Sequence, residues 1–252
     1  MSKTVSCVAP AQRKQAGSYM SKKMVSFVIP AYNEREYIEQ VLRALDKVPL
    51  PEGVRRELVV VDDGSTDGTA DFVESLRDID SVVIYRMPQN SGKGAALRAG
   101  FSIARGDVLI VCDADLEYKP SDIPKVLEPL LSGQADIVYG SRFMGDIKGM
   151  KFVNRLANRL LTVTVNILFG AKITDEATAY KAFNRNVLSS INLKCTGFEF
   201  CPEVTAKTLK RGHKIIEVPI TYEARNIEEG KKIKWQDGFI AIWTLVKYRF
   251  KD

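Results

Sequence analysis

The sequence has few of the residues that build metal-binding, disulfide-rich or membrane-spanning proteins. It has four cysteines and one histidine in 252 residues, and no CxxC pair. These numbers argue against a zinc site and a disulfide framework, and they suit a reducing compartment such as the cytoplasm. No run approaches the ~18 apolar residues of a spanning helix, and residues 1–23 lack a secretory apolar segment. Any membrane contact is therefore expected at the bilayer surface.

The net positive charge is concentrated at the N-terminus. The net charge is 37 − 31 = +6, and residues 1–23 contribute five basic residues and no acidic one, namely Lys3, Arg13, Lys14, Lys22 and Lys23. The remaining chain is close to neutral, which does not favour specific nucleic-acid binding. A basic tail fits either a solvated terminus or an anionic membrane surface. We expect a flexible tail over residues 1–23 and one domain over residues 24–252.

Strand-like and helix-like segments alternate from residue 24. The predicted strands are Met24–Ile29, Glu57–Val61, Val82–Tyr85, Asp107–Cys112 and Asp136–Tyr139, and the predicted helices are Glu34–Lys47, Asp67–Leu76, Gly94–Ala104 and Ser121–Leu131, with Ser121 as a cap. The less regular second half predicts helices over 152–169, 199–210 and 235–250, and strands over 178–183 and 215–218. This order predicts an α/β fold with a mainly parallel, doubly wound sheet. Such sheets bind ligands beyond the carboxyl ends of their strands.

Polar loops follow the first three predicted strands at that edge. The first loop carries the polar residues Asn33 and Glu34, the second carries Asp62 and Asp63, and the third carries Lys93 between two glycines. Carboxylates at this edge can accept hydrogen bonds from ribose hydroxyls or base N–H groups. Lys93 stands at a predicted helix start, where an anion can bind, although the segment is not a Walker loop.

The fourth strand is apolar and ends in three carboxylates, Asp113, Asp115 and Glu117. In a strand-like segment these side chains face one side, where they repel one another unless a cation holds them. Oxygen ligands favour Mg²⁺ or Mn²⁺, which can bridge and neutralise a diphosphate. A solvated acidic turn is the alternative.

The loops PAYNE (30–34), DDGSTDGT (62–69), NSGKGAA (90–96) and DADLE (113–117), in this order, resemble the family-two glycosyltransferases of GT-A fold. The dolichyl- and polyprenyl-phosphate hexosyltransferases are the more similar branch, and the resemblance runs over about residues 24–247. It implies inverting transfer of a hexose from GDP-mannose or UDP-glucose to a lipid phosphate. It also implies donor binding by Pro30, Tyr32, Glu34, Asp62, Asp63, Lys93 and Ala114, and a nucleotide-metal pair of Asp113 and Asp115 with Glu117 as third member.

The resemblance implies roles further along the chain. Arg142, in a Gly-Ser-Arg segment, would meet the donor phosphate. Residues 174–181 resemble a segment D-x-x-[ST]-G-[YF]-[KR], with Ala179 in place of glycine. Residues 197–203 match a segment G-[FY]-x-[FL]-x-x-E. The phosphate ligands of the acceptor would be Lys181, Arg225 and Lys232, with Lys231 as the alternative to its neighbour.

The acceptor decides the chemistry that is needed. A hydroxyl acceptor needs a base, for which Asp175 is the candidate, whereas a lipid phosphate is already anionic and needs cations. The set Arg142, Lys181, Arg225 and Lys232 favours the lipid phosphate. Transfer to a saccharide hydroxyl and a non-catalytic nucleotide-sugar-binding module remain the alternatives.

Two amphipathic segments indicate how a lipid acceptor could be reached. Residues 151–169 place Phe152, Leu156, Leu160 and Val163 on one face, beside Lys151, Arg155 and Arg159. Residues 235–250 add Trp235 and Trp243. Each segment could pack in the core or lie on an anionic membrane. We expect a peripheral protein on the cytoplasmic face of a membrane, with a separate membrane-protein partner as one means of delivering the acceptor.

Overall fold

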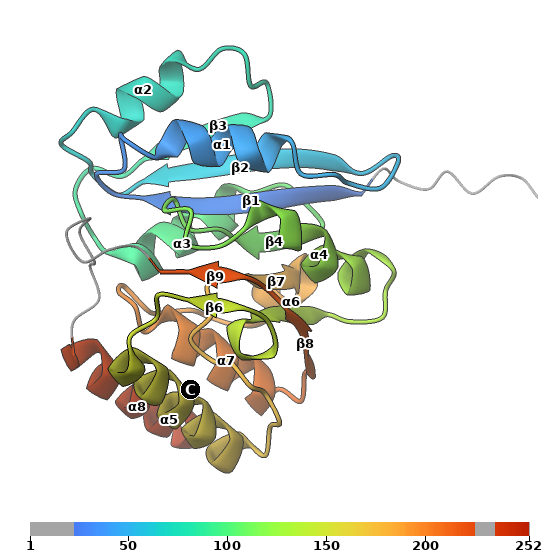
Figure 1. The fold of residues 1–252 in the computed structure, drawn as a ribbon, viewed down its shortest axis with the longest axis vertical. Helices are drawn as coiled ribbons and strands as arrows, with labels where there is room; N and C mark the ends of the chain where they lie inside the picture. Colours follow the sequence, from blue (N-terminus) through green and yellow to red (C-terminus); the bar gives the residue numbers. More distant parts are fainter. Residues whose placement is uncertain (1–22, 225–234, 252) are drawn as a thin grey trace, which may run out of the picture.

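A seven-stranded sheet forms the centre of the computed structural model, which describes residues 23–224 and 235–251 (Figure 1). The strand order is β3-β2-β1-β4-β7-β5-β8. The strands are β1 (Met24–Ala31), β2 (Arg55–Asp62), β3 (Val82–Arg86), β4 (Val108–Val111), β5 (Ile137–Ser141), β7 (Lys181–Asn184) and β8 (Ile215–Pro219). Only β7 runs antiparallel to its neighbours, so the predicted mainly parallel sheet is confirmed.

Helices cover both faces of the sheet. They are α1 (Ile38–Asp46), α2 (Thr69–Ser75), α3 (Lys93–Ile103), α4 (Ile123–Leu131), α5 (Phe152–Phe169), α6 (Arg185–Ser190), α7 (Phe200–Lys210) and α8 (Trp235–Phe250). Successive side chains of a strand point to opposite faces, so Phe27 and Ile29 of β1 join the core under α1 and α4. Val28 joins the core under α3 and α7. The fold is a single α/β domain.

The structure moves several predicted boundaries. The helix predicted over Glu34–Lys47 begins at Ile38, because residues 34–37 form a turn in which the Tyr37 N–H donates to the Glu34 carbonyl (3.0 Å). Ser121 does not cap α4, since it lies inside a 3₁₀ turn, Pro120–Asp122, that precedes the helix. Helix α6 and a small sheet of β6 (Ile147–Lys148) and β9 (Tyr222–Glu223) were not predicted.

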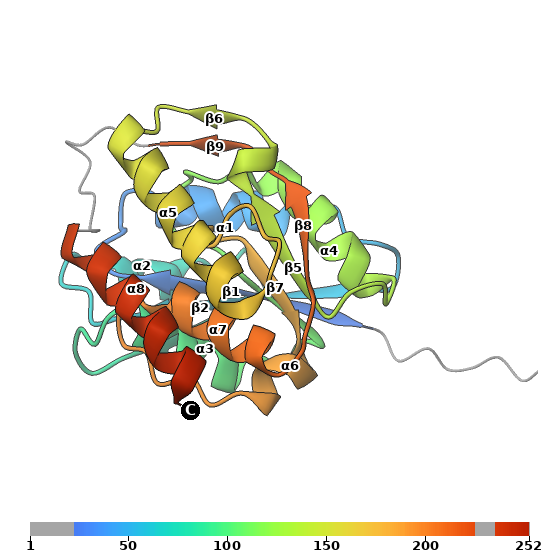
Figure 2. The same cartoon turned by 90° about the horizontal axis from the view of Figure 1, so that it is seen from below.

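Helices α5, α7 and α8 form a layer on one side of the sheet (Figure 2). They meet through a small apolar cluster that includes Val165, Ala206, Leu245 and Tyr248. Within the described residues, no helix is both long and apolar enough to cross a bilayer.

Candidate active site

The loops after β1 and β2 interlock at the carboxyl edge of the sheet. The Asn33 N–H donates to the Ser65 hydroxyl (2.9 Å), and the Thr66 N–H donates back to the Asn33 side-chain oxygen (2.9 Å). Asn33 has a φ of 52°, a conformation that asparagine tolerates better than most residues. This contact brings the half-buried Pro30, Tyr32 and Glu34 beside residues 62–69, as a shared donor site requires.

Asp62 and Asp63 are neighbours with different structural roles. Both oxygens of Asp63 accept backbone N–H groups of the next loop, from Ser91 (2.7 Å) and Gly92 (2.8 Å). Asp62 accepts the Ser65 N–H through one oxygen (3.1 Å), while its other oxygen is buried without a partner among the described residues. A buried unpaired oxygen is costly, so Asp62 is the better placed of the two to receive a ligand group.

Lys93 is the first residue of α3, and its side chain turns to the carboxylates after β4. Its ammonium lies 2.5 Å from Asp113 Oδ1. Burial alone would lower the pKa of Lys93, but the neighbouring negative charges, Asp113 first, and the hydrogen bond to Asp113 together outweigh it and raise the pKa. Lys93 is therefore a permanent cation beside the predicted metal pair.

The segment 113–117 is a turn, so the predicted strand-like arrangement of its three carboxylates is wrong. Strand β4 ends at Val111, and Leu116 adopts a φ of 59°, which reverses the chain. Ala114 is buried in the core. The Tyr222 hydroxyl donates to Glu117 Oε2 at 2.8 Å. Glu117 is thus partly committed to Tyr222 of β9, and it is less suited than the two aspartates to hold a metal.

The aspartate pair fits a metal that is shared with a diphosphate. Among the described residues, no three acidic, histidine or cysteine side chains form a ready metal cage. Burial, followed by the charges of Asp113 and Glu117, raises the pKa of Asp115 to about 7. Such crowded carboxylates favour an added cation, and Mg²⁺ is typically held by one or two carboxylates plus substrate phosphates.

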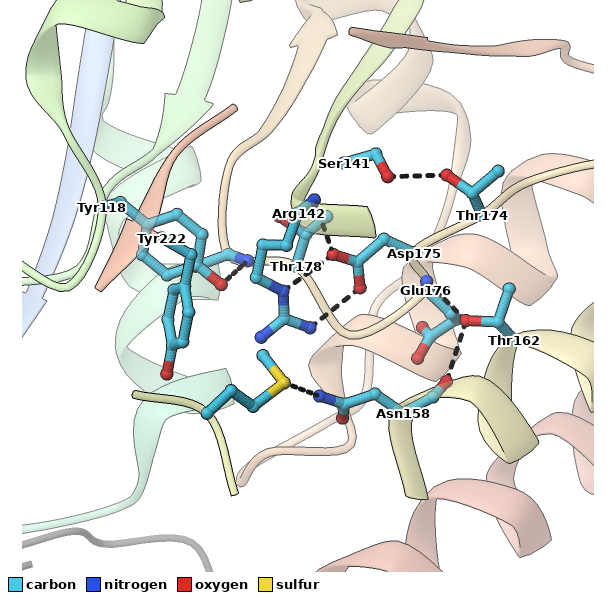
Figure 3. Close-up of polar contacts among 12 residues, drawn as sticks. Tyr118, Ser141, Arg142, Asn158, Thr162, Thr174, Asp175, Glu176, Thr178 and Tyr222 are labelled. Carbon is cyan, nitrogen blue, oxygen red and sulfur yellow. Dashed lines mark hydrogen bonds and ion pairs between the residues drawn. The ribbon is translucent and has the colours of Figure 1, made fainter. Parts of the chain in front are cut away.

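Asp175, the predicted base, is fully buried in an ion pair with Arg142 (Figure 3). Arg142 donates to it from Nε (2.7 Å), from Nη2 (2.8 Å) and from its backbone N–H (2.9 Å). A carboxylate that has no exposed surface and accepts three hydrogen bonds from one arginine has no access to an acceptor. The prediction of Asp175 as a base is therefore not supported, and Arg142 is largely committed to this pair.

Lys181 also lies away from any accessible site, contrary to its predicted contact with an acceptor phosphate. It is fully buried in β7, donates to the Glu176 carbonyl (2.5 Å), and lies 3.7 Å over the Tyr139 ring. The predicted phosphate ligands Arg225, Lys231 and Lys232 lie outside the described residues.

Three tyrosines beneath the site were not predicted as functional. Tyr118 packs against Tyr180 at 4.9 Å and Tyr222 at 5.2 Å between ring centroids, and its hydroxyl accepts the Ala179 N–H (3.0 Å). The three rings link the segment after β4 (Tyr118), the segment before β7 (Tyr180) and strand β9 (Tyr222). Their spacing along the chain has no period, so only the fold reveals the cluster.

The sheet is mainly parallel, and polar loops interlock at the tips of its strands. An aspartate pair and a lysine lie beside these loops. This arrangement defines the GT-A class of glycosyltransferases. Residues 26–191 match the family model "Glycosyl transferase family 2", and the chain belongs to this family.

Three relatives of known name are similar over most of this chain. The dolichol-phosphate mannosyltransferase of Pyrococcus furiosus is 33% identical over 211 residues, which cover 82% of this chain but only 58% of that relative's length. The undecaprenyl-phosphate mannosyltransferase of Micrococcus luteus is 35% identical, with 81% of this chain and 85% of the relative covered. The polyprenol monophosphomannose synthase of Mycolicibacterium smegmatis is 31% identical, with 81% and 79% covered.

A solved structure shows the same fold. Glucosyl-3-phosphoglycerate synthase from Mycobacterium tuberculosis, in complex with uridine diphosphate, superposes with a TM-score of 0.70 at 24% identity, over 91% of this chain and 81% of that one.

Proposed function

We propose that this glycosyltransferase moves a hexose from a nucleotide diphosphate sugar to a polyprenyl or dolichyl phosphate. The observation that carries the choice of acceptor is the burial of Asp175 against Arg142. A hydroxyl acceptor must lose its proton to a base during transfer, and the base that the sequence offered has no exposed surface. A phosphate is already anionic at neutral pH and can attack the anomeric carbon directly, with inversion.

The donor would lie across the tips of β1, β2 and β4. The buried unpaired oxygen of Asp62 would accept an N–H or hydroxyl group of the nucleoside, beside Pro30, Tyr32 and Glu34. Lys93 would meet the diphosphate, since it lies 2.5 Å from Asp113 and stays charged. Asp113 and Asp115 would hold Mg²⁺ or Mn²⁺, which when bound neutralises the charge of the leaving diphosphate.

The acceptor phosphate would be held by cations. Arg225 and Lys232, or Lys231, remain the proposed ligands, while Arg142 and Lys181 drop out of this set because they are committed to Asp175 and to the Glu176 carbonyl. Two of the three relatives are named as mannosyltransferases and the third as a monophosphomannose synthase, so GDP-mannose is the first donor to test, with UDP-glucose as the alternative. An enzyme that acts on a lipid phosphate must reach a membrane surface. We propose that this surface is the cytoplasmic face of the membrane.

The test is transfer of radiolabel from GDP-mannose and from UDP-glucose into undecaprenyl or dolichyl phosphate, with Mg²⁺, Mn²⁺ or a chelator. We expect lipid-phase label from one donor only, lost with the chelator and in Asp115→Ala. The matched control is Asp80→Ala, an exposed aspartate that precedes β3 at the amino end of the strand, opposite its tip. Label in an added saccharide, or donor binding without any transfer, would overturn the proposal in favour of a saccharide transferase or a binding module.

A further inference from the structure

The start of helix α3, which carries Lys93, packs against a loop from the second half of the chain. This loop covers residues 194–199, and its Thr196 carbonyl oxygen accepts the Ala95 N–H at 3.1 Å. A Cβ atom on Gly94 would lie 2.8 Å from another carbonyl oxygen of the loop, which is too close for any side chain. The position of Lys93, the first residue of α3, therefore depends on where the 194–199 loop lies.

One buried carboxylate, that of Glu203 on α7, holds the beginning of this loop. Its two oxygens accept the backbone N–H groups of Lys194 (2.8 Å) and Cys195 (2.6 Å). The ammonium of Lys207, one helical turn further along α7, donates to the same carboxylate and to the Asn192 carbonyl oxygen. Both side chains are buried. Glu203 and Lys207 together therefore tie the loop to α7.

Helix α8 contacts this buried ion pair through Tyr248. The Lys207 ammonium lies 4.2 Å from the centroid of the Tyr248 ring. Burial, followed by a hydrogen bond to Glu203, raises the pKa of Tyr248, so its hydroxyl stays protonated and donates to the carboxylate. The ring also packs in the apolar cluster that joins α8 to α7 through Leu245 and Ala206, and Figures 1 and 2 both show α8 alongside α7. Tyr248 thus belongs both to the helix contact and to the polar network.

The enclosure of the network makes it sensitive to the Tyr248 hydroxyl. Hydrogen bonds among buried groups strengthen one another and are stronger than the same bonds in water. The loss of one donor changes how the Glu203 carboxylate is shared among its remaining donors, which include the N–H groups of Lys194 and Cys195. A shift of these two residues moves the adjoining Thr196, and with it the contact to the start of α3.

We propose that Tyr248 is a positioning residue for the donor site, which acts on Lys93 through Glu203 and the 194–199 loop. This rests on the proposed function, in which Lys93 meets the diphosphate of the donor. It extends that function, because the packing of α8 on α7 becomes one of the factors that set donor affinity. The alternative is that Tyr248 only stabilises the fold, which predicts a loss of stability with no selective loss of binding.

Two substitutions of Tyr248 test the proposal by calorimetric titration with GDP and UDP in the presence of Mg²⁺. Tyr248→Phe removes only the hydroxyl, and we expect about threefold weaker binding of the nucleoside diphosphate that the parent binds. Tyr248→Leu also removes the ring beside Lys207, and we expect about tenfold weaker binding. The corresponding nucleoside monophosphate should lose less, because it lacks the second phosphate. Unchanged diphosphate affinity, or equal losses for both nucleotides, would overturn the proposal, and Tyr248→Phe carries the test if Tyr248→Leu does not fold.

Thr244→Val is the matched control on the same helix. Thr244 is 5% exposed, and its hydroxyl donates to the Ile240 carbonyl oxygen within α8 (2.7 Å). The control therefore also removes a buried hydroxyl from α8, but one that does not reach Glu203. We expect Thr244→Val to change the free energy of unfolding and to bind the diphosphate as the parent does. A loss of affinity that follows the loss of stability in all three variants would contradict a positioning role.

Lys93→Ala separates this inference from the proposed function. In the Lys93→Ala background, Tyr248→Leu should have little further effect on diphosphate affinity, because the group on which it acts is absent. Additive losses, or a loss in Lys93→Ala with none in Tyr248→Leu, would overturn this inference and leave the proposed function standing. If Lys93→Ala binds the diphosphate as the parent does, the proposed donor contact itself is wrong, and the role of Tyr248 falls with it.

Discussion

The carbonyl oxygen of Thr196 occupies the space that a side chain on Gly92 would need, and a Cβ atom there would overlap it. Gly92 also has a φ of 94°, immediately before Lys93. The loop 194–197 and the start of α3 therefore fit together only because residue 92 is glycine. The position of Lys93 depends on this contact.

Gly92→Ala should lower both stability and donor affinity, because backbone strain adds to the displacement of Thr196. Gly68→Ala is the matched control, since Gly68 has a φ of 84° but nothing within 4 Å of an added Cβ. We expect a loss of about 1–2 kcal/mol in the free energy of unfolding for the control and about 3 kcal/mol for Gly92→Ala. Urea unfolding measures both, and equal losses would contradict the close approach.

Lys93→Ala should weaken binding of a nucleoside diphosphate about ten- to a hundredfold, the worth of a charge-assisted hydrogen bond of about 1.5–3 kcal/mol. The corresponding nucleoside monophosphate should lose less, because Lys93 is proposed to meet the diphosphate. Calorimetric titration with both ligands tests this. Equal losses for the two ligands would assign Lys93 to the nucleoside instead.

Glu203 is predicted to act on donor binding through the position of Lys93. It is fully buried and accepts the N–H groups of Lys194 (2.8 Å) and Cys195 (2.6 Å), so it fixes the loop that packs on Gly92. We expect Glu203→Gln to weaken nucleoside diphosphate binding several-fold, but to have little further effect when Lys93→Ala is already present. Additive losses in the double variant would show that Glu203 acts on binding independently of Lys93.

Glu203 should also make the free energy of unfolding depend on pH in the acidic range. Burial alone would raise its pKa, but the bonds from Lys207 and the backbone outweigh it, so the pKa lies below the ordinary value of 4.5. Its contribution is therefore present above about pH 4.5 and is lost as the pH falls through the lowered pKa. Urea unfolding between about pH 6 and about pH 3 measures this effect. Over this pH range the free energy of unfolding should fall more steeply in the parent than in Glu203→Gln.

Asp175→Asn should mainly lower the free energy of unfolding. Removing one charge leaves Arg142 buried and unpaired, which costs about 3–5 kcal/mol when such a pair is broken. Replacing both residues, as in Asp175→Asn with Arg142→Met, should recover part of that loss. A variant Asp175→Asn that unfolds like the parent yet transfers no sugar would instead restore Asp175 as a base.

The sequence was a good guide to the sheet and to the residues at its edge. Apolar runs predicted the strands, and the polar loops at their ends do meet, as Asn33 with Ser65 and Lys93 with Asp113 show. What it could not supply was the direction of side chains in the second half. Lys181 and Lys93 are the same type of residue in the sequence, but β7 runs antiparallel inside the sheet and turns the Lys181 ammonium onto Tyr139.

The same limit applies to the buried Asp175 and to the exposed apolar side chains of α5. The sequence does not reveal the buried pair, because Arg142 and Asp175 come from segments 33 residues apart that only the fold brings together. Helical spacing identified Leu156 and Leu160 as one face, but periodicity is the same for a face turned to the core and for one turned outward.

A comparison of two acceptors tests the proposed chemistry most directly. The enzyme would be offered polyprenyl phosphate and the matching polyprenol, with the same labelled donor and metal, at neutral pH. We predict label in the phosphate and none in the alcohol, because the phosphate needs no base and Asp175 is held by Arg142. Transfer to the polyprenol at a comparable rate would contradict a phosphate-specific site.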